Sequence, residues 1–165
     1  MRYLRLLSSV FLLIALLPVA VIAAPVTTDA CDAPDTAIGA IQGSGERFAL
    51  DGTQTIEGIV TADFEDDADP GTYDLRGFYV QDAGDGDAAT SDGIFVLTGE
   101  TQNYVVVGDR VQVTGVVGES APRGASETRL KTDGAGIAIC STDNPLPAPA
   151  EITLPFARAA AREQY

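Results

Sequence analysis

The residues best suited to chemistry in this sequence are four aspartates that share one glycine-rich stretch. They are Asp82, Asp85, Asp87 and Asp92. Carboxylate oxygens on a flexible loop are the ligands that Ca²⁺ prefers, and a bound cation would relieve the repulsion among these like charges. The spacing nevertheless differs from the EF-hand pattern. Two interpretations therefore stay open for this loop, a calcium site and a solvated acidic turn.

An apolar run lies on each side of the acidic loop. FYVQ at 78–81 and IFVL at 94–97 are rich in the aromatic and β-branched residues that favour strands. Strand alternation places one set of side chains in a core: Phe78, Val80, Ile94 and Val96. It places Tyr79 and Phe95 on the opposite face, where we expect an exposed aromatic platform. The alternative is that both rings pack against the N-terminal arm or a neighbouring domain.

Catalytic groups are scarce in this chain. It contains no histidine, so no imidazole is available for acid–base catalysis. Neither a GxSxG nucleophile elbow nor a phosphate-binding GxxxxGKS/T loop occurs. Cys31 and Cys140 have no basic neighbour that would activate a thiolate. Carboxylates that lie mainly in loops offer no obvious deep cleft for a glycosidase pair. We therefore expect that the chain is not an enzyme.

The first 23 residues have the composition of a secretory signal peptide. Arg2 and Arg5 precede an apolar run over 6–23, which closes with small residues. We predict cleavage after Ala23, and hence a secreted protein, extracellular or periplasmic, with no stable membrane insertion after cleavage. A permanent N-terminal anchor is the alternative, because the apolar length approaches a membrane span.

The charge balance limits the partners of the mature chain. The full sequence has 10 Lys and Arg against 24 Asp and Glu, a formal charge of −14. Residues 1–23 contain two arginines and no acidic residue, so their removal leaves a charge of −16. Proteins that bind phosphate backbones normally carry basic clusters. This composition therefore argues against tight binding of a polyanion.

The two cysteines lie near the two ends of the predicted folded region. In an exported chain, Cys31 and Cys140 are expected to form a disulfide. That bond would tie the N-terminal lead-in to the segment after the last strand. Two free buried thiols are the alternative. A zinc site is disfavoured, because two thiols without histidine make a poor ligand set.

Five principal strands and no strong helix are expected between these cysteines. Besides the two apolar runs already described, residues 54–64 alternate, and 105–109 leads into an alternating strand at 110–117. Residues 128–132 with 137–139 supply the last strand or strand pair. Gly58 and Gly115 lie inside strands, where a glycine favours a bulge or bend. The pattern predicts an all-β, five-stranded OB-fold-like Greek-key barrel rather than a seven-stranded sandwich.

The expected domain organisation follows from these elements. After the signal peptide at 1–23, residues 24–37 form an extended lead-in, and the barrel domain spans 38–143. Residues 144–165 form a Pro-rich linker and tail.

Several short motifs occur in an order that resembles a known module. They are IQGSG at 41–45, EGIVTADF at 57–64, GFYVQD at 77–82, TSDGIFV at 90–96 and VGDRV at 107–111. Together they resemble the OB-fold module of large secreted bacterial nucleases, which precedes an endonuclease/exonuclease/phosphatase-type catalytic domain. The likeness covers about residues 38–155, and no counterpart of the nuclease domain follows. Either the gene product is truncated or the module stands alone.

Two functions of different classes follow. OB folds bind single strands across their second and third strands, so Tyr79 and Phe95 are candidates for base stacking. The candidate phosphate contacts are Arg76, Arg110, Arg123, Arg129 and Lys131. The resemblance implies weak binding of single-stranded DNA or RNA as an accessory to a nuclease. The alternative is a secreted protein-interaction module, or a calcium-stabilised structural one, with the basic residues as solvated surface.

Overall fold

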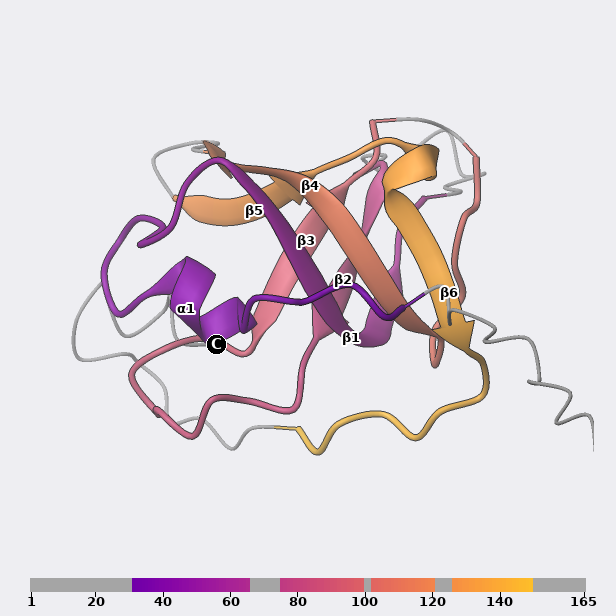
Figure 1. Cartoon of the computed structure of the whole chain (residues 1–165), viewed down its shortest axis with the longest axis horizontal. Helices are drawn as coiled ribbons and strands as arrows, with labels where there is room; N and C mark the ends of the chain where they lie inside the picture. The colour runs from indigo at the N-terminus through magenta and orange to yellow at the C-terminus, as the bar shows by residue number, and fades with distance from the viewer. Residues whose placement is uncertain (1–30, 66–74, 100–101, 121–125, 150–165) are drawn as a thin grey trace, which may run out of the picture.

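A computed structural model describes residues 31–65, 75–99, 102–120 and 126–149. Its elements in chain order are α1 (Ile38–Gln42), β1 (Thr53–Asp63), β2 (Gly77–Gln81), β3 (Gly93–Leu97), β4 (Arg110–Ser120), β5 (Glu127–Lys131), the 3-10 helix η2 (Gly134–Gly136) and β6 (Ile137–Ser141) (Figure 1). The predicted signal peptide, Arg123 and most of the predicted tail lie outside the described residues.

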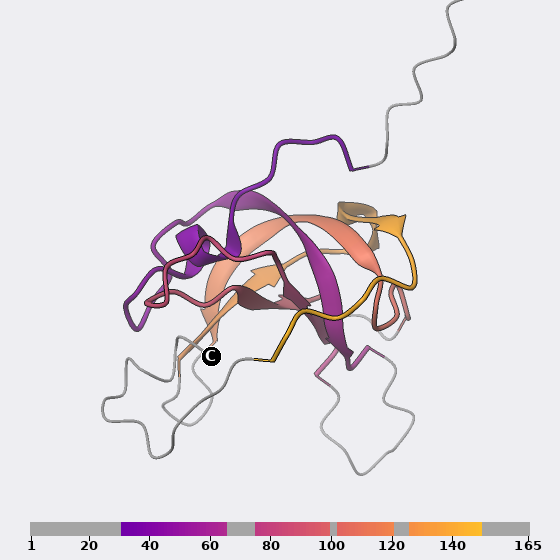
Figure 2. The same cartoon turned by 90° about the horizontal axis from the view of Figure 1, so that it is seen from below.

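The strands close into a barrel. Their order is β1-β2-β3-β5-β4, and β4 pairs with β1 to complete the circuit. The pairing of β3 with β5 is parallel, whereas the other pairings are antiparallel. Viewed from below, the strands curve around a common interior (Figure 2). The predicted all-β, OB-like five-stranded barrel is therefore confirmed.

The last strand is divided in two, as the sequence suggested. β5 pairs with the second half of β4, and β6 continues along the same edge to pair with residues at the start of β4. Between them, η2 begins after Asp133, whose side chain accepts a hydrogen bond from the N–H of Ala135. The interruption lets one edge of β4 hold two short strands.

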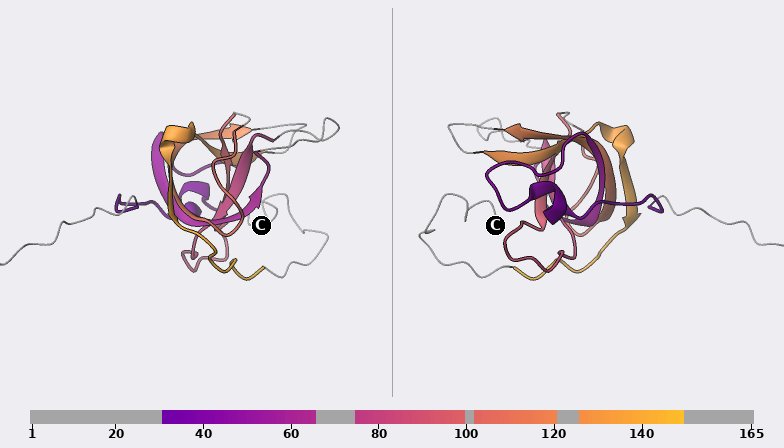
Figure 3. Two further views of the ribbon diagram at one scale, coloured as in Figure 1. Left: turned by 90° about the vertical axis from the view of Figure 1, so that its right-hand side faces the viewer. Right: turned by 60° about the vertical axis from the view of Figure 1, so that its left-hand side comes forward.

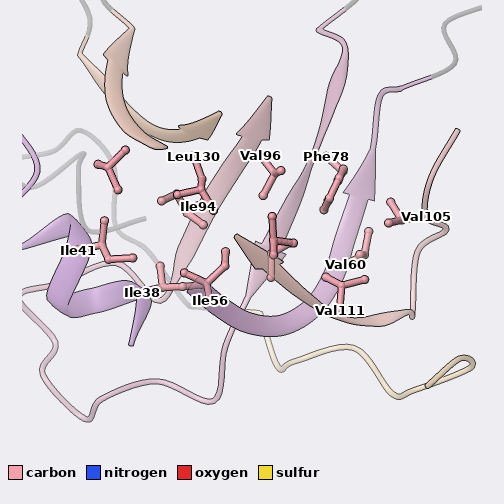
Figure 4. Close-up of a cluster of buried hydrophobic side chains, with 13 residues drawn as sticks. Ile38, Ile41, Ile56, Val60, Phe78, Ile94, Val96, Val105, Val111 and Leu130 are labelled. Atoms are coloured by element: carbon pink, nitrogen blue, oxygen red, sulfur yellow. The ribbon is translucent and has the colours of Figure 1, made fainter. Parts of the chain in front are cut away.

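The core contains the side chains that strand alternation predicts. Phe78, Val80, Ile94 and Val96 are all fully or almost fully buried. Figure 4 shows Phe78, Ile94 and Val96 within the buried cluster. The short helix α1 was missed, because two isoleucines in five residues carry little periodic signal. It lies at one end of the barrel (Figure 3), where Ile38 and Ile41 belong to the same buried cluster.

Two glycines allow neighbouring strands to approach closely. A Cβ atom added at Gly58 would lie 2.5 Å from the carbonyl oxygen of Gln81. One added at Gly115 would lie 2.5 Å from the carbonyl oxygen of Lys131. Any side chain at either position would therefore force the backbone apart, which explains why glycine interrupts these long strands.

A disulfide fastens the lead-in to the barrel. Cys31 and Cys140 are bonded across 109 positions of sequence, which confirms the predicted pair. The Nε2 atom of Gln112 donates to the carbonyl oxygens of Cys31 and Ala33, at 3.3 and 2.9 Å. A loop of this length contributes about 4–5 kcal/mol in the chain-entropy model. The bond is consistent with an oxidising, exported location.

Among the residues described, no helix has both the length and the apolar character needed to cross a bilayer.

Candidate functional site

One outward surface of the barrel combines aromatic and basic side chains. Tyr79 on β2 lies directly opposite Phe95 on β3, and Phe95 is in register with Arg129 on β5. Thr128 and Leu130 of β5 are buried, so Arg129 and Lys131 point outward by alternation. We call this surface the stacking face and define it by five residues: Phe64, Tyr79, Phe95, Arg129 and Lys131.

The three aromatic rings of the stacking face contact one another in a row. The ring centroids of Tyr79 and Phe95 are 4.9 Å apart with a tilt of 55°. Phe64 meets Tyr79 edge-on, with centroids 6.2 Å apart. Its side chain is 41% exposed. Phe64 was not predicted as a site residue, because it follows β1 and only the barrel places it beside Tyr79.

The expectation that Phe95 is exposed is wrong. Phe95 is only 4% exposed, although it lies outside the barrel core. The reason is Gly77, where an added Cβ atom would lie 2.7 Å from Cζ of Phe95. The phenyl ring therefore lies over this glycine with Tyr79 against it. Phe95 supports Tyr79, and the half-buried tyrosine and exposed Phe64 carry the accessible aromatic surface.

Glu127 holds the tyrosine at the edge of the stacking face. The hydroxyl of Tyr79 donates to Oε1 of Glu127 at 2.9 Å. Desolvation, followed by this hydrogen bond and the glutamate charge, raises the pKa of Tyr79 to about 12. Glu127 was missed, because only the parallel pairing of β3 with β5 brings it to the hairpin.

The predicted basic residues divide into two groups. Arg129 and Lys131 lie on the stacking face, and no ion pair to either is found among the described residues. Arg76 is exposed just before β2, where its carbonyl oxygen accepts hydrogen bonds from the N–H groups of Thr98 and Gly99. Arg76 therefore lies just before the β2–β3 hairpin, whereas Arg129 and Lys131 lie on β5, which pairs with β3.

Arg110 belongs to a different part of the surface. Its Nε atom donates to Oε1 of Glu57 at 3.0 Å, and Nη2 contacts the same oxygen. It lines a groove of about 530 Å³ whose walls include Gln81, Asp92 and Pro145. Arg110 lies at the start of β4, whereas β5 pairs with the other half of that strand. The structure therefore separates it from Arg129 and Lys131.

The carboxylates of the acidic loop accept hydrogen bonds from backbone N–H groups, some within the loop and one from α1. Oδ2 of Asp82 accepts from the N–H of Ile38 at 2.8 Å, which ties the loop to α1. Asp85 accepts from the N–H of Asp87, and Asp87 accepts from that of Ala89. No group of three acidic side chains in the described ranges could hold a metal ion. The calcium hypothesis thus stays a prediction without geometric support.

Asp92 closes this loop at the start of β3. Desolvation raises its pKa, against a backbone hydrogen bond from Asp85 that lowers it, and the charges of Asp82 and Asp85 raise it further. One of its oxygens, Oδ1, is buried and makes no hydrogen bond to the described residues.

Glu65, an acidic residue next to the stacking face, is buried. Glu65 follows Phe64 directly and is only 1% exposed. Its Oε2 atom accepts from the N–H groups of Tyr104 and Val105, at 2.8 and 3.3 Å. Desolvation is the main reason why the pKa of Glu65 is raised, and these two hydrogen bonds oppose it. The buried carboxyl anchors the chain directly after Phe64.

The rings of Tyr79 and Phe64 are nearly perpendicular, at 84°, so each can offer its own surface to a flat group, with Arg129 and Lys131 of β5 available to an anion. No family model, no curated protein and no solved structure matches the chain.

Proposed function

We propose that this protein is an exported module that binds single-stranded DNA or RNA weakly through the stacking face. The single observation that carries the proposal is that Tyr79 and Phe64 share one face of the sheet with Arg129 and Lys131 of β5, with Phe95 of β3 between the two groups. Its association with an extracellular nuclease rests on the ordered motifs alone.

The energetics favour low affinity. Stacking of a base on an aromatic side chain contributes about 1–3 kcal/mol and tolerates any base. Two accessible rings therefore offer a small gross gain, and a mature charge of −16 opposes the approach of a polyanion. Moderate salt should then weaken binding less than it does for a basic protein, and divalent ions should strengthen it.

The test is fluorescence anisotropy of the secreted protein with a labelled oligonucleotide. Arg129→Gln should weaken binding, because it removes a cation beside the rings. Arg110→Gln is the matched control, because it removes the same charge from the groove that Glu57 shares. An equal loss of affinity in both variants would mean that the oligonucleotide does not bind specifically at the stacking face. Absence of binding at high protein concentration, with and without divalent ions, would reject the function.

A protein-interaction module is the second candidate. Residues 104–109 run beside the last part of β1, since Glu65 accepts from Tyr104 and the carbonyl of Val60 accepts from Gly108. Val106 and Val107 are exposed on this segment, and Phe64 is exposed at the end of β1. Apolar side chains on a strongly acidic surface favour a protein partner over a polyanion. A pull-down from the secretome with wild-type protein and a Val106→Ser variant would discriminate between the two.

A further inference from the structure

A carboxylate, that of Glu127, lies next to the ring on which the proposed function would stack a base. Glu127 lies two positions before Arg129 on β5, so both side chains leave the same face of the strand. Its Oε1 atom is held by the hydroxyl of Tyr79. No other hydrogen bond to this carboxylate is found among the described residues. The tyrosine therefore orients Glu127 at the rim of its ring and leaves acceptor capacity free.

We infer that Glu127 makes the stacking face select among bases and favour guanine over thymine or uracil. The inference rests on the proposed function, which by itself predicts binding that tolerates any base. Glu127 is here a specificity-determining residue, and the stacked base is its partner.

The selection follows from hydrogen-bond chemistry. An ionised carboxylate only accepts hydrogen bonds, and its two oxygens can receive a pair of parallel donors. Guanine offers such a pair, N1–H and the 2-amino group. Thymine and uracil offer one N–H between two carbonyl oxygens, which repel a carboxylate. Because single-stranded bases expose these edges, a protein side chain can read them.

Arg129 reinforces the same choice. Arginine donates two hydrogen bonds to O6 and N7 of guanine, the commonest specific base contact. Glu127 can accept from the N1–H and 2-amino edge of guanine, and Arg129, on the same face of β5, can donate to its O6 and N7 edge. Together they match both edges of this base. Adenine and cytosine each offer an amino group to Glu127 but lack the combined pattern.

The experiment uses short labelled oligothymidylates with two central positions replaced in turn by guanine, inosine, adenine or cytosine. Wild-type protein should bind the guanine oligonucleotide at least about 5-fold more tightly than all-thymine, the lower end of a bidentate contact. Inosine lacks the 2-amino group and should fall between them.

Two variants assign the preference to the carboxylate. Glu127→Gln should bring guanine and thymine close to equal affinity while binding of the thymine oligonucleotide improves, because a negative charge leaves the face. Asp143→Asn is the charge-matched control. It removes one exposed carboxylate after β6, at a positive φ of 57° that asparagine tolerates, and should keep the guanine preference.

The outcomes separate this inference from the function beneath it. Binding of all oligonucleotides with equal affinity would overturn the inference and leave the proposed function standing. Failure of every oligonucleotide to bind would overturn both. A guanine preference that survives in a folded Glu127→Gln variant, with folding checked by circular dichroism, would also overturn the role of Glu127.

Discussion

The stacking face and the acidic loop belong to the same hairpin, yet the tip of the loop and the stacking face satisfy their polar groups in opposite ways. In the loop, Asp85 and Asp87 each accept from a backbone N–H two residues later. On the stacking face, Tyr79 finds its partner 48 positions away, at Glu127. Carboxylates that are satisfied locally do not require a ligand. Arg129 and Lys131, for which the described residues provide no ion pair, can receive an anion beside the accessible surface of Tyr79 and Phe64.

The largest expected effect separates the two regions in a binding assay. Tyr79→Ala should weaken oligonucleotide binding by about 10-fold or more, since one stacking contact contributes about 1–3 kcal/mol. Asp87→Ala changes only the loop, and the loss of a negative charge should improve binding slightly. Anisotropy titrations of both variants measure the contrast. A stronger loss from Asp87→Ala would reverse the assignment of the site.

The next effect concerns Glu65, the buried residue directly after Phe64 of the stacking face. Its raised pKa means that the folded state binds a proton more tightly than the unfolded chain, so this residue lowers stability as pH rises above 4.5 through its folded pKa. Glu65→Gln keeps an acceptor for Tyr104 and Val105. It should therefore be more stable than wild type at pH 7–8, on the order of 1 kcal/mol, and no more stable near pH 4. Denaturant unfolding at both pH values tests this, and a pH-independent difference would contradict it.

A smaller effect tests the contact between Tyr79 and Glu127. The pKa of Tyr79, about 12, lies above the ordinary value of 10, so stability from this tyrosine is complete below pH 10 and is lost as pH rises through about 12. Glu127→Gln should lower the pKa but leave it above 10, because desolvation is the largest cause. Ultraviolet titration, with Tyr79→Phe to identify the transition, measures it. An unchanged pKa of Tyr79 in Glu127→Gln would contradict the hydrogen bond between these two side chains.

The smallest expected effect concerns calcium. If the loop is a self-bonded turn, calorimetric titration with Ca²⁺ should give equal, small heats for wild type and an Asp85→Ala, Asp87→Ala double variant. A binding heat in the wild type that is absent from the double variant would support a calcium site in the loop. The acidic loop would then also be a ligand-binding region, like the stacking face.

The sequence by itself determined the features that depend on neighbouring residues or on simple counting. Alternation within 78–81 and 94–97 identified Phe78 and Val96 as core, because successive side chains of a strand point to opposite faces. Two cysteines leave one intramolecular pairing, and the structure contains it. The count of strands, with glycines inside two of them, was sufficient for the barrel class.

Only the tertiary structure decided which residues share a surface. The parallel pairing of β3 with β5 placed Arg129 opposite Phe95 and let Glu127 reach the hydroxyl of Tyr79, and no local pattern encodes these neighbours. The burial of Phe95 depends on a glycine of the opposite strand, and the burial of Glu65 depends on two N–H groups about 40 positions away. Alternation tells which side of a strand a residue faces, but exposure on that side depends on what distant segments place there.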